Sequence, residues 1–333
     1  MKRYLIIRLG ALGDVVLATA AAEAILDAEP TAQVDIVCKQ RFVGILQGHP
    51  KINMIIGLDE QGRHCGLRGL LIFLHGLPKC RYDAIIDLQN NLRSRAISFC
   101  LNGTRKVTAS KESWRRRRMV WTKRKDGRGR TVLQRYLEAV ARTGIQNPKG
   151  QPRIYPGPEA LPELPNGDFV VLAPGANRPT KRWGGYRELL VMLGKKGYRV
   201  VITGTDDERI ETGCLAAEAD GQIMDFCGRL DLPRLAGVLS RSRLVVANDT
   251  GTMHIAEAAG IPVLAIFGPT VREFGFAPWR PESRVVEADL DCRPCSLHGS
   301  RKCAAGHFRC MRSITPDMVM ATIEYMVGRV DHG

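Results

Sequence analysis

The chain has 333 residues, 44% of them hydrophobic, which is enough for two α/β domains of ordinary size with separate cores. Its 49 Lys and Arg against 34 Asp and Glu give a net charge of +15, which favours polyanionic partners such as nucleic acid, anionic lipid or a phosphorylated glycolipid. No apolar run reaches the roughly 18 residues of a membrane-spanning helix, and Gly10 and Gly13 break the first one too early for a signal peptide. We therefore expect a cytoplasmic protein.

The first half of the chain repeats a pattern of apolar strand, polar turn and helix. A buried-type strand is predicted over Tyr4–Leu9, followed by the turn GALGD and an Ala-rich helix over Val15–Leu26. Further strands are predicted in QVDIVCKQ, NMIIGLD and YDAIIDLQ, with a helix over Gly66–Gly76. Asp14 lies at the first turn, where an aspartate often caps the helix. The pattern predicts a Rossmann-like domain.

The turn after YDAIIDLQ is also polar and contains Gln89, Arg93 and Ser94. The carboxyl ends of parallel strands meet at one edge of a sheet, so we expect these side chains on the same edge as Asp14. Arg93 has the alternative role of a solvated surface charge.

Ten basic residues lie between Lys111 and Arg130, against two acidic ones. The run SWRRRRMVWTKRKDGRGR places four arginines between Trp114 and Trp121. Basic residues mixed with tryptophan suit the headgroup layer of an anionic membrane. RNA binding would use the same residues, with bases stacked on the indole rings. A solvated flexible loop is the third interpretation.

The segment NPKGQPRIYPGPEALPELPNGD contains six prolines and reads as an interdomain linker. The strand–turn–helix pattern then returns in FVVLAP, GANRPTKRWGG, YRELLVMLGKKG and YRVVITG. Asp231 and Pro233 mark the start of a helix, and Thr315 with Pro316 marks a final helix over Asp317–Val330. The predicted boundaries are a domain at 1–150, a linker at 151–168, a second domain at 169–314 and a terminal helix at 315–333.

The stretch LVVANDTGTMHIAEAAGIPVLAIFGPT, from Leu244 to Thr270, predicts a strand, a turn, a helix and a second strand. Its polar residues, which run from Asn248 to Thr252, fall at the carboxyl end of the first strand. They lead into a helix whose free amides attract anions. A phosphate-bearing ligand fits there. The alternative is that Asp249 and Thr252 only cap the helix.

Four cysteines near the end of the chain, Cys292, Cys295, Cys303 and Cys310, follow the spacing C-x2-C-x7-C-x6-C. Zinc favours four tetrahedral thiolate or imidazole ligands, so a structural zinc site is one interpretation. Reduced structural thiols are the other. A disulfide is the least expected state in a chain without a secretory signal.

The segment NDTGTMHIAEAAGIPVLAIFGPT resembles the signature of the family 9 glycosyltransferases, the ADP-heptose:lipopolysaccharide heptosyltransferases. Their usual form is N-D-[ST]-G-x-x-H with the tail G-x-P-x-[VL]-x-[LI]-F-G-P-T. The resemblance implies a GT-B fold, with two Rossmann-like doubly wound α/β domains facing a central cleft. The first domain would bind the acceptor, the second would bind the nucleotide sugar, and the last helix would pack back on the first.

The resemblance also implies an activity, which is inverting transfer of heptose from ADP-L-glycero-D-manno-heptose to the inner core of lipopolysaccharide. It implies that catalysis needs neither a metal nor another cofactor. Heptosyltransferase II-like members have a segment similar to the C-x-P-C…C…G-H…C of this chain. That likeness implies transfer of the second heptose.

Site residues follow from the matching motifs. Asp14 resembles the proposed general base, and Lys181 in P-x6-K-x-W resembles the lysine that contacts the donor phosphate, although Gly184 replaces the Pro that commonly follows the Trp. Expected donor contacts are Asp249, Thr250, Gly251, Thr252, His254 and Glu208, the last in a G-x-x-x-E motif whose Glu reaches the ribose. Expected acceptor contacts are Gln89, Arg93, Ser94, Arg115, Arg116 and Arg117. As a lone histidine on an Ala-rich helix, His254 could instead simply pack against its neighbours.

The partners that the resemblance implies are ADP-heptose, an anionic Kdo-lipid A acceptor and the cytoplasmic surface of the inner membrane, with no nucleic acid. One alternative is a family 9 transferase with another nucleotide sugar or acceptor. A different class of protein, a basic nucleotide-, RNA- or membrane-surface-binding module without turnover, predicts tight and salt-dependent polyanion binding.

Overall fold

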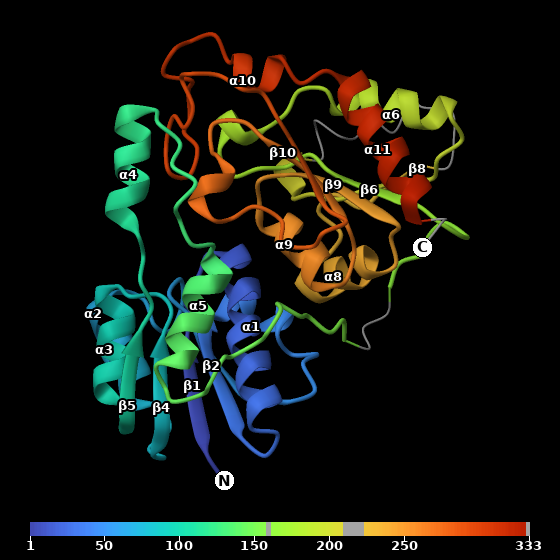
Figure 1. The fold of residues 1–333 in the computed structure, drawn as a ribbon. Helices are drawn as coiled ribbons and strands as arrows, with labels where there is room; N and C mark the ends of the chain where they lie inside the picture. Colours follow the sequence, from blue (N-terminus) through green and yellow to red (C-terminus); the bar gives the residue numbers. More distant parts are fainter. Residues whose placement is uncertain (158–160, 209–222, 331–333) are drawn as a thin grey trace. The chain divides into compact units, whose positions relative to one another are not determined.

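The structure is a computed structural model that describes residues 1–157, 161–208 and 223–330. The chain divides into two compact units (Figure 1). Unit 1 comprises Met1–Lys111 and Arg130–Pro158, and unit 2 comprises Glu112–Gly129 and Glu159–Gly333. The basic segment Glu112–Gly129 therefore belongs to unit 2, which corrects the prediction of an N-terminal domain over the whole of 1–150.

Unit 1 is built on five parallel strands in the order β3-β2-β1-β4-β5. The strands are β1 (Arg3–Ile7), β2 (Gln33–Lys39), β3 (Ile52–Leu58), β4 (Tyr82–Asp87) and β5 (Gly103–Thr108). The central strands are almost continuously apolar because helices cover both of their faces. The chain order reverses between β1 and β4, and the turns after these two strands carry Asp14 and Gln89.

Helices cover both faces of this sheet. They are α1 (Leu12–Ala28), α2 (Gly66–His75), α3 (Leu92–Cys100) and α5 (Val132–Ala141), and a 3-10 turn spans Gln40–Ile45. On one face, α1 packs against α5 and is buried over almost its whole length, which explains its Ala-rich sequence. On the other face, Phe73 of α2 and Ile97 of α3 pack against Leu5 and Ile7 of β1.

Unit 2 is built on six parallel strands in the order β11-β10-β9-β6-β7-β8. The strands are β6 (Val170–Ala173), β7 (Val200–Ile202), β8 (Ile223–Asp225), β9 (Leu244–Asn248), β10 (Val263–Phe267) and β11 (Arg284–Glu287). The order reverses between β6 and β9. Ligands bind at such switch points in open parallel sheets, and the predicted NDTGT turn follows β9.

In the part of unit 2 that the structure describes, the α-helices are α4 (Ser113–Thr122), α6 (Tyr186–Lys195), α8 (Leu232–Ser240), α9 (Gly251–Ala258), α10 (Arg309–Arg312) and α11 (Pro316–Val330). α6 and α11 cover one face of the sheet, and α8 packs on α9 (Figure 1). Asp231 caps α8 by accepting the Arg234 N–H at 2.9 Å, and α11 begins at Pro316, both as predicted. The α11 residues Met320 and Ile323 are buried in the core of unit 2. That the last helix also packs back on the N-terminal domain stays a prediction.

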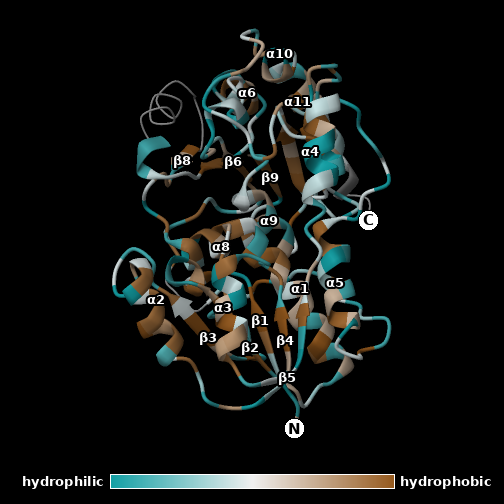
Figure 2. Ribbon diagram, turned by 90° about the vertical axis from the view of Figure 1, so that its left-hand side faces the viewer, coloured by the Kyte–Doolittle hydropathy of each residue, from teal (hydrophilic) through white to brown (hydrophobic). Residues whose placement is uncertain are grey.

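The central strands of both sheets are apolar, whereas α4 is strongly hydrophilic (Figure 2). The basic run after Glu112 forms the helix α4, whereas a solvated flexible loop was one interpretation of its sequence. In the described ranges, no helix has the length and apolar character needed to cross a membrane. The predicted fold class of two Rossmann-like doubly wound domains is confirmed.

Candidate active site

The turn between β9 and α9 is the best-organised polar site of unit 2. Asn248, the last residue of β9, is fully buried. Its Nδ2 donates to the Pro174 carbonyl at 2.7 Å, and its Oδ1 accepts the backbone N–H of Trp183 at 3.3 Å. These bonds connect the β9 turn to the loop after β6, so the two loops at the switch point of the sheet are held together.

Lys181 and Asp249 meet at this turn. The Lys181 ammonium lies 2.6 Å from Asp249 Oδ2 and donates to the Asp249 carbonyl at 3.0 Å. The Thr270 hydroxyl, on the loop after β10, donates to the same Oδ2 at 2.7 Å. The Lys181 and Asp249 side chains are only 15% and 11% exposed. Three loops thus converge on one carboxylate, and two residues predicted to contact the donor lie in contact with each other.

The N-terminus of α9 lies directly after this ion pair. Thr250 is the N-cap residue and has an extended backbone with φ of −141°. The first turn of any α-helix leaves backbone N–H groups without an intrahelical acceptor, and at α9 these include Gly251 and Thr252. An ammonium group beside free amides makes a site for an anion such as a diphosphate.

Glu208 lies at the same edge, on the segment after β7. Its carboxylate accepts the Thr205 N–H at 2.7 Å, and the residue is 8% exposed. A Cβ at Gly175 would lie 2.1 Å from this carboxylate, and one at Gly204 would lie 2.8 Å from it. The two glycines therefore leave room for Glu208 over the ends of β6 and β7. This role of Gly175 was not predicted from the sequence.

His254 is 4% exposed on α9 and stacks on Trp279, with 6.0 Å between ring centroids and 7° between ring planes. This geometry supports the interpretation in which the imidazole simply packs, here against a residue of the loop after β10. It does not support the prediction of a contact with the donor.

Arg293 organises the loop after β10 and was missed by sequence reasoning. Its side chain is fully buried, and its guanidinium donates to the Thr270 carbonyl at 2.7 Å and to Glu287 at 2.7 Å. It also donates to the carbonyls of Phe267 and Gly268. Arg293 thus holds the loop from which Thr270 reaches the site. Its position between two cysteines, Cys292 and Cys295, is the feature of the sequence that marks its segment.

The four cysteines predicted as zinc ligands are free thiols in the structure. Burial, together with the neighbouring cysteines, raises the pKa of Cys310 to about 11. Over residues 1–157, 161–208 and 223–330, no group of three or more His, Cys, Asp or Glu residues is arranged to hold a metal ion. The geometry gives the zinc prediction no support and agrees with reduced structural thiols.

In unit 1, Asp14 lies on the first turn of α1 and combines two roles. Its Oδ2 accepts the Ala11 N–H at 3.2 Å, which caps the helix. Its Oδ1 pairs with the Arg8 guanidinium at 2.7 Å and accepts the Tyr136 hydroxyl at 3.4 Å. The side chain stays 16% exposed. Asp14 is thus not the N-cap residue itself: it supports the cap from the first turn of the helix, three residues after the N-cap residue Ala11.

The partners of Asp14 are fixed by burial and charge. Burial by itself lowers the pKa of Arg8, but Asp14 and the other groups around the guanidinium more than offset this and raise it. Burial raises the pKa of Tyr136, so its hydroxyl stays protonated and can donate to Asp14. Neither partner was predicted. Tyr136 lies on α5, far from Asp14 in the sequence.

The turn after β4 lies beside Asp14, since Gln89 Oε1 accepts the Gly10 N–H at 3.2 Å. Ser94 is fully buried and donates to Asp87 at 2.8 Å. It therefore stabilises the turn, and its predicted contact with the acceptor has no support. Arg93 is half exposed and pairs with Glu60 at 3.0 Å.

The three arginines predicted to bind the acceptor have different environments, all within unit 2. Arg115 pairs with Glu112 and Asp126 and donates to the Glu273 carbonyl at 3.0 Å, so it holds the segment in place. Arg116 is partly buried, with its guanidinium 5.8 Å from the centre of the Phe276 ring. Arg117 is exposed. Their segment groups with unit 2 and not with the unit that contains Asp14, and their contact with the acceptor stays a prediction.

Comparisons with known proteins agree with this geometry. The family model described as glycosyltransferase family 9 (heptosyltransferase) matches residues 71–305. Lipopolysaccharide heptosyltransferase 1 of Pseudomonas aeruginosa is 27% identical over 316 residues, covering 88% of this chain and 86% of that protein. Lipopolysaccharide heptosyltransferase 2 of Salmonella typhimurium is 26% identical over 349 residues, covering 95% and 96%.

Among solved structures, the E. coli heptosyltransferase WaaC with ADP-2-deoxy-2-fluoro heptose superposes with a TM-score of 0.74 at 22% identity, covering 97% of this chain and 99% of that one. This likeness supports the GT-B fold. The family model covers well over half of the chain and includes the β9 turn with its Lys181–Asp249 pair. The chain therefore belongs to glycosyltransferase family 9, the heptosyltransferases.

Proposed function

We propose that this heptosyltransferase transfers heptose from ADP-L-glycero-D-manno-heptose to the inner core of lipopolysaccharide, at the second heptose. The observation that carries the proposal is the Lys181–Asp249–Thr270 cluster beside the free amides of α9, which suits a nucleotide diphosphate sugar. The named relatives act in the same chemistry, and one solved neighbour was crystallised with an ADP-heptose analogue.

In the proposed reaction, the acceptor hydroxyl loses its proton to Asp14 and attacks the anomeric carbon of heptose with inversion. The bond from that carbon to the diphosphate oxygen breaks, and ADP leaves with its negative charge. Lys181 and the amides of Gly251 and Thr252 stabilise this charge, so the reaction needs no metal. Asp249 holds Lys181 in place and accepts hydrogen bonds from the heptose hydroxyls, and Glu208 accepts hydrogen bonds from the ribose.

Arg8 and Tyr136 orient Asp14 for the proton transfer. The guanidinium balances the carboxylate charge, and the phenol hydroxyl donates to the same oxygen. Oδ1 is held by these two groups, whereas Oδ2 accepts, among the described residues, only the Ala11 N–H at 3.2 Å, so Oδ2 is the atom that takes the proton. Gln89, which is bonded to the adjacent Gly10, would contact the acceptor sugar.

The acceptor is anionic and lipid-anchored, so the proposal also places the protein at the cytoplasmic surface of the inner membrane. Transfer to the second heptose is supported by the likeness of the Cys292–Cys310 segment to heptosyltransferase II-like members. Relatives numbered 1 and 2 match at almost the same identity, so the acceptor must be identified by assay.

The test is transfer from ADP-heptose to Kdo2-lipid A and, separately, to the same acceptor with one heptose already attached. Each reaction is run with and without EDTA. We expect product only on the heptosylated acceptor and no effect of the chelator. Product on Kdo2-lipid A alone would contradict the second-heptose assignment, and loss of activity in EDTA would contradict the metal-free mechanism.

The role of Asp14 is tested with Asp14→Asn, which keeps an oxygen for the Ala11 N–H. We expect kcat to fall by roughly 100- to 10,000-fold, the usual contribution of a general base, while KM for ADP-heptose changes little. A melting temperature close to wild type would show that the fold is intact. Unchanged kcat in a folded variant would rule out Asp14 as the base.

A further inference from the structure

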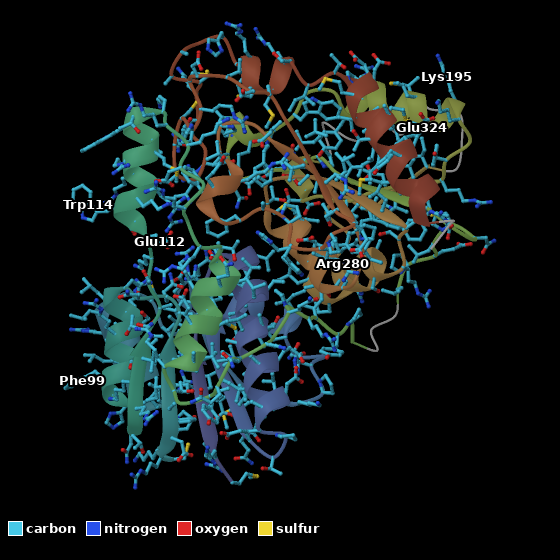
Figure 3. All side chains as sticks on the ribbon, in the orientation of Figure 1. Phe99, Glu112, Trp114, Lys195, Arg280 and Glu324 are labelled. Carbon is cyan, nitrogen blue, oxygen red and sulfur yellow. The ribbon has the colours of Figure 1, made fainter. Side chains whose placement is uncertain are left out.

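The outward face of α4 carries an unusual combination of side chains. Trp114, Arg117, Arg118 and Trp121 are spaced by three and four residues and therefore share one face of the helix. Trp114 is 76% exposed and Trp121 is 79% exposed. Both arginines are exposed as well. Figure 3 shows Trp114 projecting from α4, away from the rest of its unit.

The opposite face of α4 is fixed to unit 2. Met119 is 1% exposed and packs against Val271 and Phe274. Just beyond the helix, the Lys123 ammonium donates to the Pro294 carbonyl at 2.9 Å. Together with the contacts of Arg115, these anchors prevent the helix from turning its tryptophans inward. The Trp-Arg face is therefore presented to solvent by a helix that is held in place.

The chemistry of this face selects its partner. Indole rings favour the boundary between lipid headgroups and acyl chains, where the ring is removed from water while its N–H stays in a polar layer. Guanidinium groups bind phosphate in a planar, bidentate manner. α4 contains four arginines and no acidic residue, so its field attracts a surface of negative charge. A short helix with these residues along one side fits a flat anionic layer.

We propose that the α4 face formed by Trp114, Arg117, Arg118 and Trp121 docks the protein on an anionic lipid bilayer. The indoles enter the headgroup layer and the guanidinium groups bind lipid phosphates. The inference rests on the proposed function in one respect, since the acceptor of that function is anchored in such a bilayer. It assigns membrane contact to unit 2, the unit that contains the donor-site residues.

The experiment is flotation of the full chain with vesicles of phosphatidylethanolamine and phosphatidylglycerol, compared with vesicles of phosphatidylcholine. We expect binding to the anionic vesicles only. Trp114→Ala/Trp121→Ala should weaken it by roughly tenfold or more, as should Arg117→Ala/Arg118→Ala, since each basic residue near a membrane contributes a factor of about five. In the wild type, brominated lipid should quench tryptophan fluorescence, and Trp114→Phe/Trp121→Phe should abolish that quenching.

Two control variants distinguish docking through this surface from an effect of net charge and from docking through the exposed apolar faces of α2 and α3. Arg234→Ala/Arg241→Ala removes the same charge from two exposed positions, one on α8 and one directly after it, and should leave vesicle binding unchanged. Leu71→Ala/Phe99→Ala trims the exposed apolar faces of α2 and α3, which are 58% and 83% exposed at these positions, and should also leave it unchanged. If Arg234→Ala/Arg241→Ala weakened vesicle binding as much as Arg117→Ala/Arg118→Ala does, net charge alone would explain the effect. A loss confined to Leu71→Ala/Phe99→Ala would move the docking surface to unit 1.

Two further readouts keep the inference independent of the proposed function. Trp114→Ala/Trp121→Ala should transfer heptose to a delipidated, water-soluble acceptor as the wild type does, and should fail only on acceptor embedded in vesicles. A wild type that transfers no heptose but binds anionic vesicles through α4 would refute the proposed function alone. Single-stranded RNA that displaces the protein from vesicles at lower concentration than lipid would assign the face to nucleic acid and overturn the inference.

Discussion

Replacing Glu257 with glutamine should change how the stability of unit 2 depends on pH. Glu257 lies on α9 and is 1% exposed. Its carboxylate accepts the N–H groups of Trp279 and Arg280, each at 3.0 Å, and the Ser283 hydroxyl at 2.8 Å. Burial raises the pKa of Glu257 from 4.5 to about 7, although these three donors act in the opposite direction.

The sign of the effect follows from the raised pKa. The folded state binds this proton more tightly than the unfolded state, so the stabilisation is complete below pH 4.5 and is lost as the pH rises through about 7. Each pKa unit corresponds to about 1.4 kcal/mol, so the shift represents about 3 kcal/mol of unfolding free energy. Wild-type stability should therefore fall by about this amount between pH 4.5 and pH 8 relative to Glu257→Gln, which has no proton to lose.

Tryptophan fluorescence is the appropriate assay, because all four tryptophans, at positions 114, 121, 183 and 279, belong to unit 2. Urea unfolding followed by this signal at pH 5, 6, 7 and 8 would give the difference between wild type and Glu257→Gln at each pH. Glu282→Gln is the matched control, since its side chain is 51% exposed on the adjacent loop. Parallel pH profiles for wild type and Glu257→Gln would refute the reasoning, whatever their absolute offset.

Three further substitutions test other buried polar groups. Lys181→Met should destabilise unit 2 by about 3 kcal/mol because it leaves the Asp249 carboxylate without its cation, and adding Asp249→Asn should recover part of that loss in a double-mutant cycle; additive costs would argue against the pair. Arg293→Met should cost about 3–5 kcal/mol in urea unfolding because several carbonyls lose their donor, and a cost below 1 kcal/mol would show that the loop does not depend on it. Ser94→Ala should cost about 1–2 kcal/mol and leave KM for the acceptor unchanged, whereas a raised KM would restore Ser94 as an acceptor contact.

Local patterns in the sequence predicted most of the elements. Continuous apolar runs indicated strands buried on both faces, and such strands form the centre of both sheets. The starts of α8 and α11 were predicted at Asp231 and Pro316 because capping and the fixed proline φ act within one turn. The NDTGT turn could be recognised for the same reason, since its strand, its turn and its helix are contiguous.

The remaining features depend on residues that are far apart in the chain. Arg115 contacts Glu273 across 158 positions, and this contact, with the burial of Met119, assigns α4 to unit 2. Arg293 and Glu257 became recognisable only when their partners on other loops were in place. Burial, which decides whether a polar side chain faces a ligand or supports a loop, is set by packing between distant segments. The sequence by itself therefore determined the elements and their turns, and only the tertiary structure decided which polar residues face the site.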